Sequence, residues 1–453
     1  MPEFLAAHAL LPEGWRRDVR IASDEAGLIT DVTPGAPRGG PAHFLRGHVI
    51  PGVGNLHSHA FQRAMAGGAE RRSPAGRDSF WSWRETMYRF ALTISPEDAQ
   101  AIGAMVYAEC LTRGFTHVAE FHYLHHAPDG SPYVDRSEMA QRLFAAAEAA
   151  GIGITMLPSL YRHGGIFGAP PHEGQRRFLN DLDGFQEIVN RVRATAGRQR
   201  NAAWGVAPHS LRAVTPAMLE AMAEFDAPIH IHAAEQEKEV QECLHATGLR
   251  PVEWLLRNCP LDRRWVLIHA THMSEAETRE LAATGAVAGL CPSTEASLGD
   301  GIFPLPAYLA AGGILGLGTD SHVGTDPAAE IRQLETSQRL ALELRSVATD
   351  TERPHPGRGL LERALEGGAQ ACGVAMGAIA VGKRCDLVEL DDEHPTLVGR
   401  EGDGLLDAWA FGPADRMSRS VAVGGVVVVE SGRHIREGTI REGFATVMRK
   451  LGA

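Results

Sequence analysis

The chain has 453 residues, of which 44% are hydrophobic and 22% charged, so its composition excludes disorder and allows a large buried core. Its formal net charge of -12 excludes general nucleic-acid binding, although a few arginines would still attract a small anionic substrate. No apolar stretch reaches the ~20 residues that cross a bilayer, no basic leader precedes an apolar run, and the six cysteines form no CxxC pairs. We therefore expect a cytoplasmic protein with free thiols and no membrane partner.

The two ends of the chain are predicted to be β-rich. Residues 18–21 alternate polar and apolar side chains, as a half-buried strand does. Near the other end, residues 386–390 form a predicted strand, and residues 420–429 form two strands around a Gly-Gly turn. We expect residues 1–50 and 376–453 to pair into one small β-sandwich domain with a C-terminal helical tail.

The middle of the chain alternates short apolar runs with longer helical patterns, which is typical of βα units. Helical patterns include residues 97–113, 136–150 and 216–225. Eight apolar runs are predicted strands: 48–50, 115–118, 152–156, 203–206, 228–231, 265–268, 287–290 and 314–317. Because large α/β barrels grow by insertion from about 250 residues, the predicted fold is α/β, with a (β/α)8 TIM-type barrel over residues 51–375.

Ionisable residues follow almost every one of these runs. They are His57/His59, Glu120/His122/Tyr123, Tyr161/Arg162, His209/Arg212, His232/Glu235, His269/His272, Ser293/Glu295 and Asp320/His322. Chance placement accounts for two or three such groups, but hardly for all of them. Since barrel active sites gather at the C-terminal ends of the strands, we expect these side chains to converge on one cavity.

A metal site is predicted from three of these strand ends. His57 and His59 are two residues apart, so they point the same way from a strand and can reach one ion. His230 and His232 also share a face, which leaves the ligand open by parity; we favour His232 because it is nearer the strand's end. With Asp320 and a water, three imidazoles make an open site for Zn²⁺. Such an ion lowers the pKa of its water towards ~7 and gives a hydroxide nucleophile.

Proton-handling residues follow the same pattern. Glu235 lies three residues past His232, where it would carry a proton from the water to the leaving group. The competing interpretation is an exposed glutamate at the start of a helix. His269 would face the reacting water. Which of Glu235, His269 and Asp320 takes the first proton stays open, because coupled groups share their titrations.

These residues resemble the amidohydrolase superfamily, in its branch of mononuclear aminohydrolases. That branch pairs HxH on strand one with HxxE on strand five, His on strand six and Asp on strand eight. Residues 381–388 are also similar to the segment by which such enzymes return to a small β domain. No lysine ends the fourth run, so a carboxylated lysine that bridges two metals is not expected. We therefore expect one divalent ion per chain, most readily zinc.

A closer resemblance is to the formimidoylglutamate deiminases, and it covers nearly the whole chain. It rests on residues 55–63, 81–85, 120–123, 207–212 and 291–301, with Ser297 in place of an expected Asn as a mild departure. The resemblance implies a homodimer that converts N-formimidoyl-L-glutamate and water to N-formyl-L-glutamate and ammonia, a step of histidine degradation.

A dianionic small-molecule substrate of this kind needs cationic or hydrogen-bonding partners. Arginine binds carboxylate as a bidentate fork, so Arg212, helped by His209, is the first choice. Arg84 and Tyr123 are second choices that the resemblance supplies; a surface arginine and a wall tyrosine are the competing interpretations. Gln62, three residues past His59, would hydrogen-bond the formimidoyl group.

Three other functions remain open at this point. The same metal set would deaminate a nucleobase, purine or triazine ring, or a different formimidoyl acid, because one methylene is worth only ~1–3 kcal/mol of discrimination. A non-catalytic binding protein on the same barrel is disfavoured, since all candidate ligands stand in place.

Overall fold

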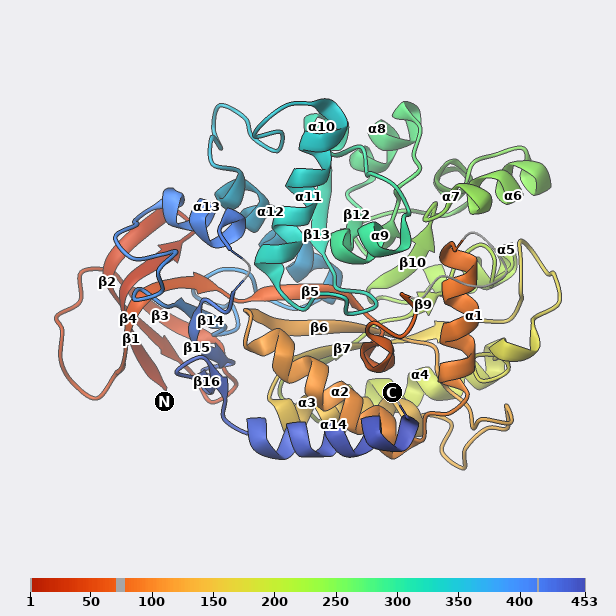
Figure 1. Ribbon diagram of the computed structural model, residues 1–453, viewed down its shortest axis with the longest axis horizontal. Helices are drawn as coiled ribbons and strands as arrows, with labels where there is room; N and C mark the ends of the chain where they lie inside the picture. Colours follow the sequence, from red (N-terminus) through yellow and green to blue (C-terminus); the bar gives the residue numbers. More distant parts are fainter. Residues whose placement is uncertain (1, 71–77, 414, 453) are drawn as a thin grey trace.

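The computed structural model describes residues 2–70, 78–413 and 415–452 (Figure 1). Strands from both ends of the chain form one eight-stranded sheet in the order β17-β16-β15-β14-β4-β1-β2-β3. Its strands are β1 (Glu3–Leu11), β2 (Gly14–Ser23), β3 (Ile29–Thr33), β4 (His43–Pro51), β14 (Leu387–Leu390), β15 (Ser418–Val423), β16 (Val426–Glu430) and β17 (Arg433–His434). Because β4 and β14 pair antiparallel, the prediction that the two ends share one β unit is confirmed.

The remaining strands form two parallel sheets. One contains β5 (Val53–Ser58), β6 (Phe115–His122), β7 (Gly153–Leu160) and β8 (Ala202–Trp204), with β9 (Ala207–Pro208) paired to β7. The other contains β10 (Ile229–Ala233), β11 (Trp265–His269), β12 (Val287–Leu290) and β13 (Ile314–Leu317). Isolated parallel bridges join the sheets on both sides, at Val206–Ile229 and Ser58–Asp320. The predicted α/β class with parallel strands is confirmed.

Two strand predictions need correction. The run 48–50 lies in β4 of the terminal sheet, and the strand that leads into the HxH motif is β5 instead. The strand is short and contains Gly54, so the apolar pattern did not reveal it; Gly54 is needed there because a Cβ would lie 3.2 Å from the backbone of Gly368. The fourth run is split at Gly205, where a Cβ would lie 2.6 Å from both the Leu157 side chain and the Pro228 carbonyl.

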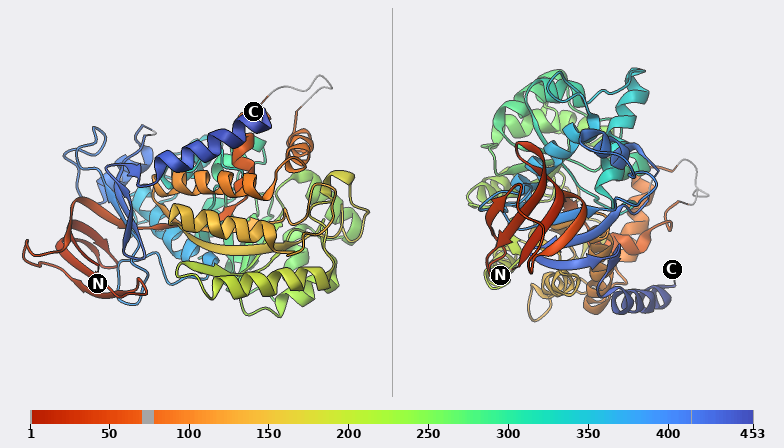
Figure 2. Two further views of the ribbon diagram at one scale, coloured as in Figure 1. Left: turned by 90° about the horizontal axis from the view of Figure 1, so that it is seen from below. Right: turned by 90° about the vertical axis from the view of Figure 1, so that its left-hand side faces the viewer.

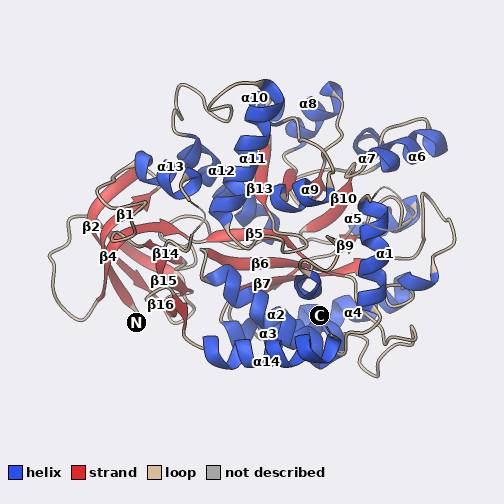
Figure 3. Cartoon of the chain, in the orientation of Figure 1, coloured by secondary structure: helices blue, strands red, loops and turns tan. Residues whose placement is uncertain are grey.

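Helices surround the parallel strands on the outside (Figure 3). They are α1 (Phe80–Ala91), α2 (Pro96–Leu111), α3 (Glu138–Ala150), α4 (Leu182–Ala196), α5 (Pro216–Ala223), α6 (Glu237–Thr247), α7 (Pro251–Asn258), α8 (Glu275–Thr284), α9 (Pro292–Leu298), α10 (Leu305–Ala310), α11 (Pro327–Leu342) and α12 (Pro356–Cys372), with 3-10 turns η1 (Ala60–Met65) and η2 (Glu173–Gln175). Of the later helices, α13 (Asp403–Phe411) packs on α11 and α12, and α14 (Glu437–Leu451) lies along α2 (Figure 2). None of the helices in the described ranges combines the length and apolar character that a bilayer crossing requires.

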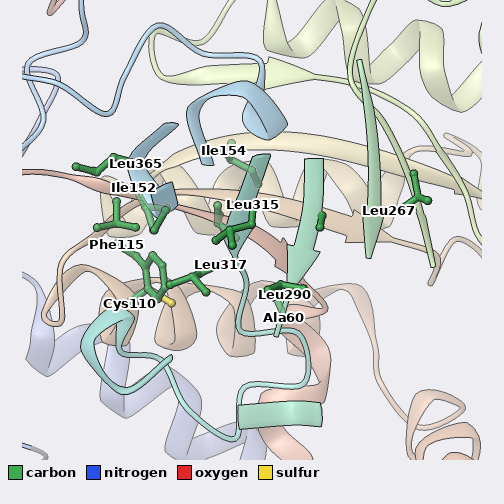
Figure 4. Packing of buried hydrophobic residues seen from close by; sticks show 14 of the residues in the cluster. Ala60, Cys110, Phe115, Ile152, Ile154, Leu267, Leu290, Leu315, Leu317 and Leu365 are labelled. Carbon is green, nitrogen blue, oxygen red and sulfur yellow. The ribbon is translucent and has the colours of Figure 1, made fainter. Parts of the chain in front are cut away.

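The core lies between the parallel strands and their helices. Figure 4 shows Phe115, Ile154, Leu315 and Leu317 packed together there, and all four are at most 1% exposed. Strands buried on both faces are characteristic of parallel sheets with helical cover. The core therefore holds the strand ends, and whatever side chains they carry, in fixed positions.

Helix α12 closes the amino-terminal ends of β5 and β13 by an unusually close approach. A Cβ at Gly367 would lie 2.0 Å from the Leu315 carbonyl oxygen, and one at Gly368 would lie 2.9 Å from the Gly54 carbonyl oxygen. Only glycine lets helix and strand backbones meet at this distance.

We expect Gly367→Ala to lower the free energy of unfolding by about 1–3 kcal/mol, because the added methyl forces the α12 backbone away from β13. The matched control is Gly443→Ala on α14, where a Cβ meets nothing within 4 Å. That change should be neutral or stabilise by up to about 1 kcal/mol through helix propensity. Urea unfolding of both variants checks this; a Gly367→Ala midpoint at or above that of the wild type would contradict it.

Candidate functional site

Four predicted metal ligands converge at the carboxyl ends of β5, β10 and β13. The Nε2 atoms of His57 and His232 lie 3.2 Å apart. An Asp320 carboxylate oxygen lies 3.5 Å from Nε2 of His57 and 3.3 Å from Nε2 of His59. All four side chains are buried. Stretches more than 250 residues apart in the sequence thus present four donor atoms to one small volume.

The surroundings of these side chains fit a divalent cation. Nδ1 of His59 hydrogen-bonds the Phe121 carbonyl at 2.8 Å, and Nδ1 of His232 hydrogen-bonds the His209 carbonyl at 2.9 Å. A proton held on Nδ1 leaves the Nε2 lone pair facing the shared point. Burial lowers the pKa of His57 and of His232 well below the usual range, which maintains the neutral form that binds metal.

His230, the alternative ligand by parity, has a different partner. Its Nε2 lies 2.9 Å from the Ala371 carbonyl oxygen of α12. It therefore faces the closed end of the strands, one layer deeper than His232. Because parity gives both residues the same face, depth along the strand is what separates them.

The predicted proton-handling residues lie beside the ligands. His269 Nε2 is 3.6 Å from a Glu235 oxygen and 3.8 Å from an Asp320 oxygen, and its Nδ1 is 3.2 Å from Glu295. Burial opposes the charged imidazolium, but Glu235, Glu295 and Asp320 outweigh it and raise the pKa of His269 to about 10. Burial also raises the pKa of Glu235, against the attraction of His269 and Arg212. Glu235 is only 5% exposed, so the alternative of an exposed helix-start glutamate is wrong.

Several of the strand ends leave the sheet through left-handed backbone conformations. The φ angles are 51° at Ala234, 69° at His269, 48° at Ala270 and 45° at Asp320. Such conformations cost on the order of 1–3 kcal/mol each outside glycine, and they concentrate at functional sites. Here they turn the chain so that functional side chains at neighbouring strand ends point into one space.

A narrow pocket, open to solvent at its mouth, lies over the four ligands. Of the residues predicted for the site, nine line it: His59, Gln62, Arg84, Tyr123, His209, Arg212, His232, Glu235 and Asp320. His57 and His269 lie behind its wall, with no exposed surface. The predicted site residues are therefore brought together. The pocket also has wall residues that the sequence did not indicate, among them Met87, Tyr88 and Phe178, which do not follow a strand and so gave no signal.

Two arginines in this pocket have unused hydrogen-bonding capacity. Arg212 lies 3.6 Å from Glu235 through Nη2, but its buried Nε has no partner among the described residues. Arg84 stacks over Trp81 at 4.4 Å and over Tyr88 at 5.4 Å, and its Nε is also without a described partner. Two guanidinium groups of this kind, that of Arg212 buried and that of Arg84 half-buried, attract a ligand with carboxylate groups.

Contacts with neighbouring residues fix the orientation of two other polar side chains in the pocket, Gln62 and His209. Gln62 donates from Nε2 to the Tyr123 hydroxyl at 2.8 Å, which leaves its Oε1 buried and without a partner in the described structure. His209 lies between Tyr161 and His232, with ring centroids 4.4 and 4.8 Å away. Burial and the charge of Arg212 lower the pKa of His209 well below its usual value, so this imidazole is neutral.

Comparisons with known proteins cover the whole chain. The sequence profile of the amidohydrolase family matches residues 48–428, and the profile described as the N-terminal domain of formimidoylglutamate deiminase HutF matches residues 4–41. A formimidoylglutamate deiminase of Pseudomonas aeruginosa is 48% identical over 454 residues, covering 100% of both proteins. A 5-methylthioadenosine/S-adenosylhomocysteine deaminase of Natronomonas pharaonis is 28% identical, covering 86% of this chain and 82% of that protein.

The fold has a close counterpart among solved structures. The crystal structure of an amidohydrolase from Brucella melitensis is 47% identical, with a TM-score of 0.95, and the match covers 100% of both chains. Both the terminal sheet and the α/β body are therefore shared with that protein.

We expect His232→Ala and Asp320→Asn to lose most bound metal and all measurable turnover, because each removes one of the converging donor atoms. The control is His230→Gln, whose amide can keep the bond to the Ala371 carbonyl and whose metal content should stay unchanged. Metal per chain, measured by mass spectrometry after purification with zinc, checks both. Full metal in His232→Ala, or a metal-free His230→Gln, would contradict the ligand set.

Proposed function

Because the chain belongs to the amidohydrolase family, and within it to the formimidoylglutamate deiminases, we propose that this pocket hydrolyses N-formimidoyl-L-glutamate. The products are N-formyl-L-glutamate and ammonia, and the reaction is a step of histidine degradation. The observation that carries this function is a pocket that combines a metal-ligand set with two arginines, Arg212 buried and Arg84 half-buried. The same pocket therefore contains both the groups for hydrolysis and the groups that would bind carboxylates.

The substrate would lie across the pocket with its formimidoyl carbon over the ligands. Arg212 and His209 would receive one carboxylate, and Arg84 with Tyr123 the other, since both guanidinium groups have free donors. Gln62 would accept a hydrogen bond from the formimidoyl N–H, because its Nε2 is engaged by Tyr123 and its Oε1 has no partner among the described residues. The formimidoyl group would therefore meet a hydrogen-bond acceptor, and the two carboxylates would meet hydrogen-bond donors.

We infer that one zinc ion is held by His57, His59, His232 and Asp320. Such an ion supplies a water that is nucleophilic at neutral pH. A single ion is favoured because His209, and not a lysine, follows β9, so no carboxylated lysine would bridge a second metal. Donors of this type, three imidazoles and one carboxylate, suit zinc.

The residues of the chain then handle protons and charge. Water adds to the formimidoyl carbon, the bond from that carbon to the terminal nitrogen breaks, and this nitrogen leaves as ammonia, while the carbon keeps the oxygen and its bond to the glutamate nitrogen. Glu235, beside the ligands, would carry a proton from the water to the departing nitrogen. His269, held between Glu235 and Glu295, would orient the attacking oxygen and donate to it as negative charge develops.

We propose that the parallel strands form a closed (β/α)8 barrel over residues 51–375, with β8 and β9 as one interrupted strand. The isolated parallel bridges between the sheets, Ser58–Asp320, Val206–Ile229 and Ser210–His232, support this closure. Residues 1–50 and 376–453 would form the small β domain as a sandwich, since their single sheet surrounds its own core of Phe4, Val19, Ile21 and other apolar residues. Helices α13 and α14 belong to this segment by sequence but pack on the α/β body.

We further propose a cytoplasmic homodimer that binds neither nucleic acid nor membranes. All six cysteines are free, which is characteristic of a reducing compartment, and the net charge is -12. Leu340, Leu342 and Leu344, at the end of α11, expose 82%, 46% and 61% of their surface and offer an apolar area for the second subunit.

Ammonia release tests the function directly. We expect turnover of N-formimidoyl-L-glutamate by the zinc-loaded protein, slower turnover of formimidoyl-L-aspartate, and little or none of guanine, cytosine or S-adenosylhomocysteine. Glu235→Gln should retain its zinc and lose at least ~100-fold in kcat, because the amide cannot accept a proton. Preference for a ring substrate would refute the assignment, and a Glu235→Gln variant at full rate would remove Glu235 from proton transfer.

Arg212→Ala is expected to raise KM for N-formimidoyl-L-glutamate by at least ~10-fold, because a charged hydrogen bond to a carboxylate is worth about 1.5–3 kcal/mol. Steady-state kinetics at saturating zinc measure it. Arg162→Ala is the control: Arg162 also follows a strand, but it does not line the pocket. If Arg212→Ala kept the KM of the wild type, Arg212 would not bind the substrate.

A further inference from the structure

One buried carboxylate lies behind both Arg212 and Glu235. Glu239 occupies the first turn of α6, has no exposed surface and does not line the pocket. Its side chain nevertheless contacts two pocket residues with different proposed roles. Arg212 would bind a substrate carboxylate, and Glu235 would transfer protons. Neither the predicted ligands nor the substrate would touch it.

The Glu239 carboxylate contacts two backbone N–H groups and one side chain. Oε1 accepts a hydrogen bond from the Ala234 N–H, and Oε2 accepts one from the Glu235 N–H, both at 3.3 Å. Oε2 also lies 3.9 Å from Nη2 of Arg212. The two amides belong to the segment that leaves β10 through the left-handed conformation of Ala234. Glu239 thus fixes the backbone that carries Glu235 and one end of the Arg212 guanidinium.

The charge of Glu239 is required as well as its shape. Burial disfavours the Arg212 cation, but Glu239 and then Glu235 outweigh this and raise the pKa of Arg212 above its usual value. Without Glu239, the guanidinium would keep only Glu235 as a charged partner and would be drawn away from the substrate. A glutamine provides one acceptor in place of two, and its NH₂ group would face a backbone N–H.

We infer that Glu239 is a positioning residue that ties recognition of the substrate carboxylate to proton transfer, by holding Arg212 and the Glu235 backbone with one carboxylate. The inference rests on the proposed function. It predicts that loss of Glu239 damages both substrate affinity and rate, although Glu239 contacts neither substrate nor metal.

The first test is Glu239→Gln. We expect KM to rise at least tenfold and kcat to fall at least tenfold, with zinc content and urea midpoint close to those of the wild type. The matched control is Glu242→Gln on the same helix, whose exposed carboxylate pairs with Lys238 at 2.7 Å and which should leave both constants unchanged. Wild-type turnover in the same assay shows separately whether the proposed function holds.

A double-mutant cycle with Arg212→Ala separates the two effects. In the Arg212→Ala background, Glu239→Gln should no longer raise KM, because Arg212 is gone, but should still lower kcat through the Glu235 backbone. Kinetic constants of Glu239→Gln within twofold of the wild type, or a KM effect that persists undiminished without Arg212, would overturn the inference.

Folding defects are covered by a second variant. Glu239→Asp keeps the charge but withdraws the carboxylate by one methylene, and we expect smaller changes of both constants with full zinc content. If both Glu239 variants lose zinc and unfold at lower urea in proportion to their loss of rate, Glu239 has only a structural role and the inference is overturned.

Discussion

The arrangement of this protein depends on holding three imidazole nitrogens and a carboxylate oxygen within bonding reach of one point at the floor of a pocket. No local element can do this, because His57, His232 and Asp320 come from strands far apart in the sequence. Parallel strands solve the problem, since their carboxyl ends meet at one side of the sheet. The close approach of α12 at the opposite ends, and the terminal sheet that continues into β5 through β4, serve to keep these strand ends where they are.

Burying so many ionisable groups is costly, and the structure shows how the cost is distributed. An isolated buried charge is strongly disfavoured, and replacing a buried ion pair with apolar residues is often neutral or stabilising by about 1–4 kcal/mol. Here each charge is shared: Arg212 between Glu235 and Glu239, and His269 between Glu235, Glu295 and Asp320. The left-handed residues at the same strand ends add strain. Such a network is poorly explained by stability, and well explained by a need for oriented charges around a reacting carbon.

The sequence predicts those features of the fold and the site that depend on local residue patterns. Spacing by two places His57 and His59 on one face, and the apolar runs locate most strands, because both depend on local periodicity. Periodicity cannot separate His230 from His232, which differ only in depth along β10. It also missed β5, whose Gly54 lets the strand approach α12 closely. Glu239 gave no signal, since a glutamate in the first turn of a helix is ordinary helix chemistry.

The two arginines also bear on which molecules the pocket rejects. A neutral purine or triazine would offer Arg84 and Arg212 ring nitrogens in place of carboxylates, and a buried donor left unpaired costs about 1–3 kcal/mol, more when it is charged and has no charged partner. A substrate with two carboxylates removes this penalty, so discrimination against rings arises from what they leave unsatisfied. Gln62 extends the same logic to the reacting end. Its amide, oriented by Tyr123, presents an acceptor, which suits the N–H of a formimidoyl group and opposes the carbonyl oxygen of the formyl product. Under the proposed function, Gln62 would therefore favour the reacting end of the substrate over that of the product, while the arginines would bind the carboxylates of both.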